Sequence, residues 1–593
     1  TMTTVIVFLP MIFVDGIAGE IFTPMSKTIA FSLLASLVVA LTFIPMLSSK
    51  LLRVEVDEEK NKQGTVTKGY KSILCWCLNH RYLVAGSLIV VLLSFGFGLV
   101  KGYIPLETEF FPKSDRGKIN VYYELAQGTR LEETNQFSEQ LKEQITGISE
   151  ITDISREIGS DNNYEGEMEI DLVDLEERER GVTKVAEEVR RKLDDLAGAK
   201  INVVPQTSMM GPQGKGGSAI NVNLSGPDLD TLLNLAQEIE GKIEDIEGTR
   251  NIAVTPKARK PELEIIPKEN IAKEIGITKQ QLFAALNTAV DGSDVSKYKE
   301  GGDEYDIRLK LAEAETKSIN DLLDVKISAP QGGVVPLSQV ADIRYATGPN
   351  AIEREEQERK FTISTDTYQR SLGAVLDDVK TEMSNMDLPR GYSIDYKGDA
   401  GDMRESFQEL GQAMIMAIIL VYMVMAAQFE SLVHPFVIMF TVPISLVGAI
   451  TALIITGTTL SVNGFIGMLM LAGIVVNNGI VLVDYINTRR EFEDREEAIL
   501  NAGPIRLRPV LMTASTTMLA MVPLALGIGA GAEMQQSMAI VVIGGLLLAT
   551  FLTLVIVPVI YDIMEDLSAV VGGFIRNLLH GEEPQQQGEN NSM

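Results

Sequence analysis

The sequence predicts a polytopic α-helical membrane protein with a large α+β domain outside the membrane. Three observations support this fold class. The chain of 593 residues is 46% hydrophobic, yet its net charge is −28 and its mean hydropathy is +0.13. The apolar residues gather in long runs, whereas most of the negative charge lies between residues 104 and 408. The segment 104–408 also carries repeated patterns of strand and helix.

Seven apolar runs have about the 20 residues that a helix needs to cross a bilayer. They are residues 26–48, 82–103, 410–429, 433–457, 461–486, 508–529 and 537–563. Lys and Arg accumulate in the loops 49–81 and 487–508, which places both loops in the cytoplasm. With seven crossings, we expect the acidic segment to lie outside the cytoplasm and the C-terminus to lie inside it.

The composition excludes several classes of protein. A nucleic-acid-binding protein needs a basic surface, which a chain with 80 acidic and 52 basic residues does not offer. Two cysteines exclude a disulfide scaffold. We find no Ser/His/Asp or Cys/His constellation, so we expect no enzymatic activity. Cys75 and Cys77 with His80 are too few ligands to predict a zinc site.

The first 47 residues resemble a later stretch when they are shifted forward by 513 positions. At this offset Pro10 meets Pro523, Glu20 meets Glu533 and Pro45 meets Pro558. We therefore interpret the chain as the end of one repeat followed by one whole repeat. The apolar run 1–14 begins without an initiator Met, and we expect the chain to be a fragment whose first part is missing.

The acidic segment follows a β-α-β-β-α-β pattern of apolar periodicity, which is the split βαβ of ferredoxin-like folds. The predicted elements are strand 118–127, helix 131–147, strands 151–158 and 167–173, helix 181–197 and strand 200–205. A second copy is predicted in two pieces, 218–255 and 360–398, with an insertion between them.

Polar side chains inside a membrane span call for a reason, because they are costly in lipid. Asn477 and Asn478 lie near the middle of the span 461–486, and Thr513 lies in the next one. Hydrogen bonding between helices and membership of an ion pathway both explain them. Arg506 precedes Pro509, which predicts a first helical turn at the cytoplasmic surface. No Asp or Glu lies at mid-depth, so any proton-binding acid is expected outside this chain.

Seven motifs lie in an order and spacing that resemble those of a known family. They are FLPM at 8–11, IPML at 44–47, YIP at 103–105, EFFP at 109–112, QFES at 428–431, GIVVNNGIVLVDY at 473–485 and RLRPVLMT at 506–513. The chain resembles the C-terminal part of the permease subunit of an RND (resistance–nodulation–division) efflux pump of the hydrophobe/amphiphile type. The likeness covers nearly the whole chain except its final tail.

The resemblance implies a domain map with ferredoxin-like porter subdomains and a docking insertion. Its parts are the end of the first repeat at 1–48, a cytoplasmic linker with an amphipathic helix at 49–81, span seven at 82–103, the first porter subdomain at 104–214, the second at 215–259 and 345–399, the docking insertion at 260–344, spans eight to twelve at 400–565 and a cytoplasmic tail at 566–593.

The resemblance also implies the function and the site residues. It predicts export driven by the proton gradient with no resident cofactor, and proton-relay roles for Asn477, Asn478, Thr513 and Arg506. Some members of the family have a lysine where this chain has Asn477. The family's substrate-pocket loop falls near 159–166, where Tyr164 is the aromatic residue. No aromatic drug pocket is evident there.

The expected partners are small amphiphilic substrates, membrane lipid, two further copies in a homotrimer, a periplasmic adaptor and, where an outer membrane exists, an outer-membrane channel. No nucleic acid is expected. The expected location is a bacterial plasma (inner) membrane. Two alternative hypotheses stay open at this point: an RND-type exporter of metal ions or lipids, and a non-transporting fragment or subunit.

Overall fold

The computed structural model describes residues 2–51, 65–160, 162–194, 196–207, 218–256, 260–312, 319–330, 332–348, 351–529 and 531–579. The chain divides into two compact units. Unit 1 comprises Thr1–Ser225, Asn234–Val254 and Thr362–Met593, and unit 2 comprises Gly226–Leu233 and Thr255–Phe361. Unit 1 holds the apolar helices and most of two α/β sheets.

Seven of the described helices are long and apolar enough to cross a membrane. They are α2 (Gly16–Leu51), α4 (Arg81–Val100), α13 (Asp399–Phe429), α14 with α15 (Val433–Met439 and Thr441–Thr456), α16 (Val462–Arg490), α17 (Arg495–Ala525) and α18 (Glu533–Leu579). Shorter helical segments are α1 (Met2–Phe8), η1 (Pro10–Phe13) and α3 (Thr65–Asn79). Several of these helices extend beyond the predicted apolar runs. For example, α13 begins at Asp399 instead of residue 410.

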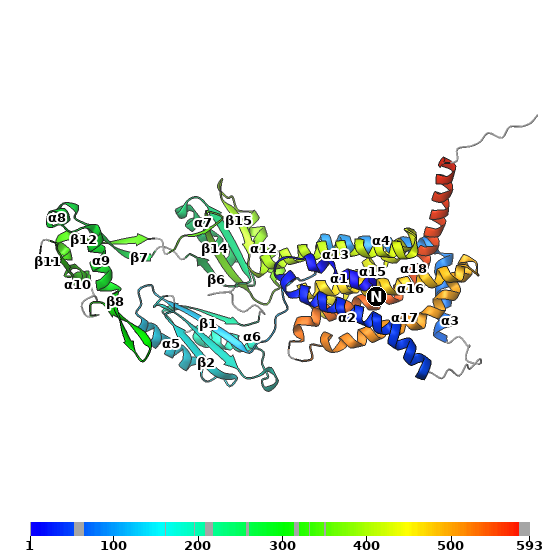
Figure 1. Cartoon of the computed structure of the whole chain (residues 1–593), viewed down its shortest axis with the longest axis horizontal. Coiled ribbons are helices and arrows are strands. Elements are labelled where there is room, and N and C mark those ends of the chain that lie inside the picture. The colour runs from blue at the N-terminus through cyan, green and yellow to red at the C-terminus, as the bar shows by residue number, and fades with distance from the viewer. Residues whose placement is uncertain are drawn as a thin grey trace, which may run out of the picture. The chain divides into compact units, whose positions relative to one another are not determined.

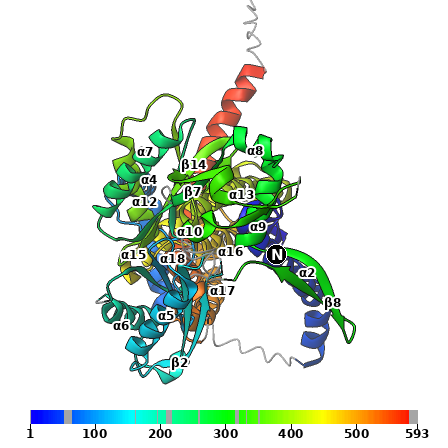
Figure 2. The same cartoon turned by 90° about the vertical axis from the view of Figure 1, so that its left-hand side faces the viewer.

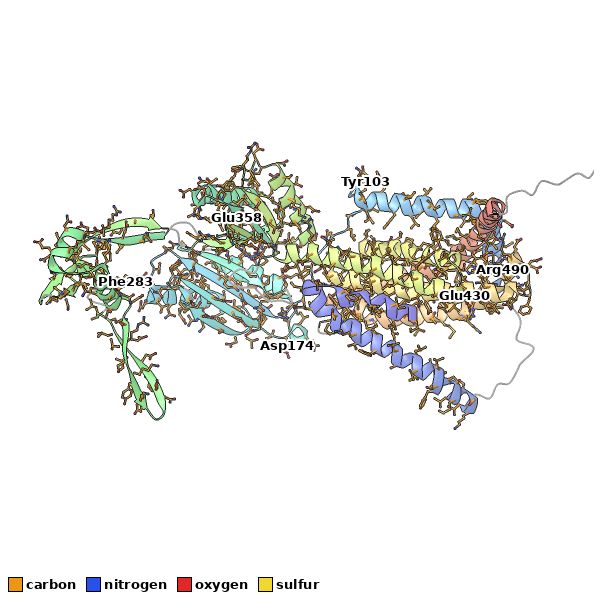
Figure 3. The ribbon with its side chains drawn as sticks, turned by 45° about the horizontal axis from the view of Figure 1, so that its top comes forward. Tyr103, Asp174, Phe283, Glu358, Glu430 and Arg490 are labelled. Carbon is orange, nitrogen blue, oxygen red and sulfur yellow. The ribbon has the colours of Figure 1, made fainter. Side chains whose placement is uncertain are left out.

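The long helices of unit 1 form a bundle in which α15, α16, α17 and α18 lie side by side (Figure 1). Glycines let α15 and α18 approach closely, because a Cβ atom on Gly544 would lie 2.2 Å from the Cβ of Ala452. The bundle core is formed by buried aliphatic residues such as Leu453, Leu471 and Leu546. Glu430 and Arg490, at the ends of α13 and α16, mark one end of the bundle (Figure 3).

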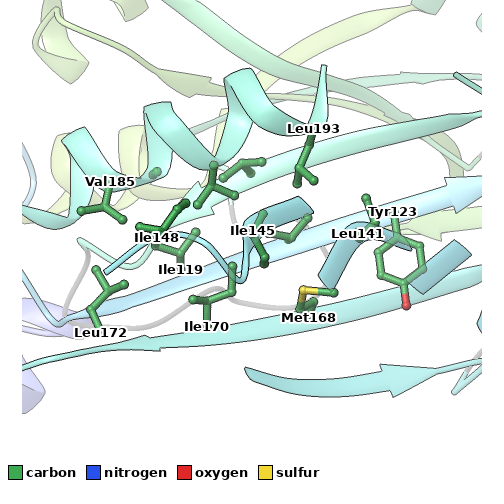
Figure 4. Packing of buried hydrophobic residues seen from close by; sticks show 14 of the residues in the cluster. Ile119, Tyr123, Leu141, Ile145, Ile148, Met168, Ile170, Leu172, Val185 and Leu193 are labelled. Atoms are coloured by element: carbon green, nitrogen blue, oxygen red, sulfur yellow. The ribbon is translucent and has the colours of Figure 1, made fainter. Parts of the chain in front are cut away.

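The first α/β sheet has the strand order β2-β3-β1-β4, and each neighbouring pair is antiparallel. Its elements are β1 (Lys118–Leu125), α5 (Leu131–Ile145), β2 (Ile151–Ile158), β3 (Glu165–Leu172), η3 (Leu175–Glu177), α6 (Val182–Leu193) and β4 (Ala199–Pro205). Alternating residues of β1 and β3, including Ile119 and Ile170, pack against Leu141 of α5 and Val185 of α6 (Figure 4). The apolar stripe on each helix therefore covers one face of the sheet.

The second sheet contains β13, β14, β5 and β15 in that order, with β6 paired to β14. Its elements are β5 (Ile220–Gly226), α7 (Leu229–Glu244), β6 (Thr249–Thr255), β13 (Glu353–Glu355), β14 (Glu358–Thr367), α12 (Leu372–Ser384) and β15 (Ser393–Lys397). The strand β15 is followed at once by α13, so this sheet is joined directly to a long apolar helix.

Unit 2 has its own small core, which includes Ile277, Leu282, Ile327 and Leu337. Its elements are β7 (Lys260–Pro267), α8 (Glu269–Ile275), α9 (Lys279–Val290), β8 (Ser293–Glu300), β9 (Asp303–Leu309), α10 (Ile319–Leu323), β10 (Lys326–Ser328), β11 (Val334–Pro336), α11 (Leu337–Val340) and β12 (Ala341–Gly348). Strands β8 and β9 form a hairpin that extends away from α8 and α9 (Figure 2). Phe283 lies on the exposed face of α9 (Figure 3).

Candidate functional site

A cavity of about 460 Å³ in unit 1 is lined by residues of both α/β sheets. Volumes of this size are typical of sites for drug-sized ligands. Its lining combines aromatic and aliphatic side chains with charged ones, among them Glu109, Phe110, Phe111, Lys113, Thr183, Glu187, Arg190, Val203, Pro205, Arg250, Asn251, Asp366, Tyr368, Gln369, Leu372 and Asp399. A mixed lining of this kind suits a ligand that has both an apolar body and a polar group.

One wall of the cavity is a strap, residues 107–111, that is bonded to the start of α16. Glu109 N donates to the carbonyl of Leu460 at 3.1 Å, and Leu460 N donates to the carbonyl of Glu107 at 2.8 Å. Val462 N donates to the carbonyl of Phe110 at 3.2 Å. Helix α16 begins at this point because the Ser461 Oγ caps it by accepting from Gly464 N. This wall of the cavity is therefore hydrogen-bonded to a long apolar helix.

Glu109 of the strap faces the cavity in a largely buried position. Burial raises the pKa of its carboxyl, because a charge is costly away from water. Lys113 at 3.8 Å and the hydroxyl of Thr459 at 3.2 Å oppose this shift. Phe110 is almost fully buried and its ring centroid lies 4.4 Å from that of Phe111.

Three charged residues that line the cavity form a cluster. Glu187 Oε1 accepts from Arg190 and, at 2.5 Å, from Arg250 Nη1. The Arg250 guanidinium carbon also lies 3.1 Å from the ring centroid of Tyr368. Glu187 lies on α6 and Arg250 on β6, so this cluster links the first α/β sheet to the second.

Asp366, at the end of β14, accepts a hydrogen bond from Asn251 Nδ2 at 2.9 Å. Burial raises the pKa of the Asp366 carboxyl, and the bond from Asn251 opposes the shift. Asn251 has φ = 53° and Gln369 has φ = 56°, a left-handed conformation that is uncommon for residues other than glycine. Such backbone conformations gather at functional sites, and here two of them line one cavity.

The predicted relay residues Asn477 and Asn478 lie on α16, about four turns from the strap. Asn477 is exposed in this chain and Asn478 is half-buried. Within the described residues, neither side-chain amide forms a hydrogen bond with another residue. The structure thus places the pair in the apolar bundle but does not join it to Thr513 or Arg506.

Arg506 and Thr513 lie on α17, where the predicted first helical turn at Arg506 is wrong. The helix begins at Arg495, whose neighbours Glu496 and Glu497 favour a helix N-terminus, and Pro509 lies inside it. The Arg506 guanidinium carbon lies 4.5 Å from the ring centroid of Tyr485. Thr513 Oγ1 donates to the carbonyl of Val510 within its own helix at 3.0 Å.

Tyr164 lies in the turn before β3, where its carbonyl accepts from Leu125 N at 2.9 Å. Tyr164 does not line the cavity of 460 Å³, so the structure does not place it among the residues that form this cavity. The sequence reasoning missed Glu187, Arg250 and Asp366. One signal was available, since Asp366 lies at the end of a predicted strand, where polar residues commonly serve binding sites. The separation of Arg250 from Asp366 by an insertion hid their proximity.

Curated relatives match the chain over almost its full length. The Swarming motility protein SwrC of Bacillus subtilis (strain 168) is 29% identical over 95% of this chain and 54% of its own length. The Cobalt-zinc-cadmium resistance protein CzcA of Cupriavidus metallidurans is 26% identical over 94% of this chain and 54% of its own length. The Multidrug resistance protein MdtC of Pectobacterium carotovorum is 26% identical over 96% of this chain and 56% of its own length. The chain therefore spans about half the length of the relatives it matches.

The fold is similar to a solved structure, the crystal structure of a heavy metal efflux pump. The TM-score is 0.80 at 24% identity, and the match covers 95% of this chain and 58% of the other. The model of the AcrB/AcrD/AcrF family matches residues 1–565. Members of this family are transporters of the inner membrane, which fits the seven long apolar helices. The chain belongs to the AcrB/AcrD/AcrF family of RND efflux permeases.

Proposed function

We propose that the chain is part of a permease that exports amphiphilic organic compounds at the expense of the proton gradient. The observation that carries this proposal is the cavity of about 460 Å³, whose strap wall is hydrogen-bonded to α16. A ligand in the cavity contacts apolar side chains such as Phe111 and Leu372 together with charged ones. Family membership supplies the class of activity, and the lining of the cavity favours a ligand with an apolar body.

Within this proposal, the two α/β sheets are porter subdomains. The antiparallel order β2-β3-β1-β4 with helices α5 and α6 supports a ferredoxin-like assignment for the first of them. Unit 2 corresponds to the docking insertion. The assembly is a homotrimer with a periplasmic adaptor and, where an outer membrane exists, an outer-membrane channel.

The proposed energy source is the proton motive force, and no resident cofactor is needed. Asn477, Asn478, Thr513 and Arg506 are the candidates for a proton relay. Two observations support this assignment. The four residues lie on α16 and α17, and α16 is hydrogen-bonded to the cavity wall. Asn477→Leu and Thr513→Val are expected to slow export while leaving ligand binding to the cavity unchanged.

A metal-ion exporter is the alternative, because the CzcA and MdtC relatives are equally similar to this chain at 26% identity. Deletion of the gene that encodes this chain tests both hypotheses. Greater sensitivity to dyes and detergents with unchanged tolerance of cobalt, zinc and cadmium supports the organic exporter. The reverse pattern supports the metal exporter, and no change in either profile contradicts both.

A further inference from the structure

The chain has three histidines, and His434 lies in the helix bundle of unit 1. It is the second residue of α14, shortly after Glu430, at the end of the bundle that Glu430 and Arg490 mark (Figure 3). This end is opposite the strap, because α16 begins at the strap and ends at Arg490. The side chain of His434 is 16% exposed, so a proton from water can reach it.

Five side chains of α14, α16 and α18 form a closed cycle of hydrogen bonds, which we call the His434 cycle. His434 Nε2 lies 3.2 Å from Glu565 Oε1, and His434 Nδ1 lies 3.4 Å from Asn487 Nδ2. Asn487 Oδ1 accepts from the Tyr561 hydroxyl at 2.6 Å. Arg490 Nη1 donates to the Tyr561 oxygen at 2.6 Å and lies 3.0 Å from Glu565 Oε2, which closes the cycle.

The direction of each bond in the His434 cycle follows from the chemistry of its groups. A guanidinium only donates, so the Tyr561 oxygen accepts from Arg490 and its single hydrogen is given to Asn487 Oδ1. The Asn487 amide nitrogen therefore faces His434, and it also only donates. His434 Nδ1 must then accept, and the one proton of a neutral imidazole lies on Nε2 toward Glu565. The cycle is complete only while His434 is neutral.

A second proton on His434 breaks the cycle between α14 and α16. It occupies Nδ1 and faces the Asn487 amide nitrogen, so that two donors oppose one another. If the amide turned over, the Tyr561 oxygen would face two donors and its own hydrogen would lose its acceptor. Tyr561 is fully buried, and a buried donor without a partner is unfavourable. Glu565, in contrast, attracts the charged imidazole. The proton therefore keeps the contact of α14 with α18 and removes its bond to α16.

The other charges near His434 do not replace the lost bond. Helix α14 packs against α13, α15, α16 and α18, and α15 contains no titratable residue. The charged residues of the other three helices at this end include Glu430, Asp484, Arg489, Arg490, Asp562 and Glu565. Of these, Glu565 alone is bonded to His434 in the part of the chain that the structure describes. Asp562 is bonded to two arginines, and Arg490 repels a protonated imidazole.

We infer that the His434 cycle is a pH-sensitive switch in the contact between α14 and α16. Neutral His434 keeps the two helices bonded, and one proton on the imidazole releases them. Histidine is the side chain that ordinarily changes its charge between about pH 5 and 8. The loop charges predict that this end of the bundle faces the cytoplasm, so the switch responds to the pH of the cytoplasm. The inference goes beyond the proposed export function and does not depend on the substrate.

Nitrogen NMR of the histidines tests the protonation states directly. The full chain is labelled with nitrogen-15 histidine and reconstituted into lipid nanodiscs, and the His434 signals are identified by their absence in His434→Gln. We expect the tautomer with its proton on Nε2 at about pH 8.5, and a doubly protonated ring as the pH is lowered toward about 5.5. The opposite tautomer at the higher pH, or a ring that stays neutral at the lower one, would overturn the inference.

Two variants change the neighbours of His434 in ways that a purely structural role would not register. Tyr561→Phe keeps the ring that stacks on His434 but removes the hydroxyl, so the Asn487 amide is free to turn its oxygen toward Nδ1. The midpoint of the His434 titration is therefore expected to rise, although the deleted hydroxyl does not touch His434. Asn487→Asp provides an acceptor for Nδ1 directly and is expected to raise the midpoint by about one pH unit or more.

Gln428→Glu is the matched control for the added charge, because Gln428 is exposed near the end of α13 and water screens its side chain. Its effect on the midpoint is expected to be clearly smaller than that of Asn487→Asp. An effect as large as that of Asn487→Asp, or an unchanged midpoint in both Tyr561→Phe and Asn487→Asp, contradicts the switch. Because each variant is read separately, the failure of one to fold leaves the other as a test.

Hydrogen exchange measures the release of α14. His434→Gln carries a donor and an acceptor on an uncharged side chain, so it should keep the cycle closed at every pH. We expect the α14 amides to exchange several-fold faster in the unmodified chain than in His434→Gln at about pH 5.5, and equally fast at about pH 8.5. Equal rates at both pH values would refute the release. Such a failure leaves the proposed export untouched, and absence of export from cells leaves the switch untouched.

Discussion

The backbone of Gly373, in the first turn of α12, lies directly against Thr108 of the strap. A Cβ atom on Gly373 would be 2.0 Å from Thr108 Oγ1, and Gly373 N donates to the Thr108 carbonyl at 3.0 Å. The other side of the strap is bonded to residues 460–462 at the start of α16. The strap is therefore held between the second α/β sheet and the membrane bundle of unit 1, and glycine is the residue that permits this approach.

Gly373→Ala is expected to lower the free energy of unfolding by about 1–3 kcal/mol, because the added methyl group overlaps Thr108 Oγ1. The measurement is thermal unfolding of the purified chain in detergent. Gly241→Ala, within α7, is the matched control, since no atom lies within 4 Å of its Cβ position. Thr108→Ala removes the overlapping oxygen and should restore part of the stability lost in Gly373→Ala. Equal stability of the two glycine variants would contradict this account.

The packing of α15 on α18 gives a second prediction. Gly544→Leu places a large side chain where a Cβ atom alone would lie 2.2 Å from Ala452. The helices must then separate, so we expect a loss of stability of at least about 1–3 kcal/mol. Gly96→Leu in α4 serves as the control, because the space around Gly96 is open. A comparable unfolding temperature for both variants in the same detergent would show that α15 and α18 are not closely packed.

The pair Glu150–Arg180 predicts a dependence of stability on pH. Arg180 Nε and Nη2 lie 2.6 and 2.7 Å from the two carboxylate oxygens, and these bonds lower the pKa of Glu150 to about 2. The unfolded value is near 4.3. The contribution of the pair is therefore complete above about pH 5 and is lost as the pH falls toward 2.

Glu150→Gln should accordingly flatten the fall in unfolding temperature between pH 5 and pH 2. Glu143→Gln is the control, because Glu143 is exposed and has no ion pair among the described residues. Circular dichroism melts across this pH range provide the measurement. A Glu150→Gln profile as steep as that of the unmodified chain would be evidence against the pair.

Two acidic residues in the second half of α18, Asp562 and Asp566, are expected to contribute unequally to the stability of the chain. Asp562 is bonded to Arg81 and, at 2.7 Å, to Arg495, and Asp566 contacts the same two arginines at 2.7 Å. The side chain of Asp562 is 11% exposed and that of Asp566 is 38% exposed. Loss of a less exposed partner leaves charges less well solvated.

We therefore expect Asp562→Asn to destabilise the chain more than Asp566→Asn does. The expected loss for Asp566→Asn is about 1 kcal/mol or less, whereas Asp562→Asn should approach the ~3–5 kcal/mol of a buried pair. Chemical denaturation in a single detergent measures both variants, and Asp484→Asn on α16, an exposed site, controls for the loss of charge. An equal loss of stability in Asp562→Asn and Asp566→Asn would show that the difference in exposure does not affect the free energy of unfolding.

Elements with a strong apolar period could be predicted from the sequence. The alternation after Ile151 predicts the strand that the structure shows at Ile151–Ile158, and the period of 3.6 residues after Leu131 predicts α5. The ends of the long helices were harder to predict, because helix formation continues past the apolar run into polar sequence. This is why α17 begins at Arg495, well before the predicted start at 508.

The cavity could not be predicted, because its walls come from distant parts of the chain. Glu109, Glu187 and Asp366 are each separated by more than 70 residues, and unit 2 intervenes before Asp366. Asparagine adopts the left-handed conformation more readily than most residues, but the sequence does not show that Asn251 is an asparagine that does so. The assignments of Asn477, Asn478, Thr513, Arg506 and Tyr164 stay predictions.

Three backbone hydrogen bonds, made by Glu107, Glu109 and Phe110 of the strap with Leu460 and Val462, connect a wall of the cavity directly to the start of α16. A helix is stiff along its axis, and Asn477 lies 15 residues after Val462, about 22 Å along this rod. Axial displacement of α16 therefore changes the shape of the cavity. By thermodynamic reciprocity, a ligand that favoured one position of this cavity wall would bias the axial position of the two asparagines.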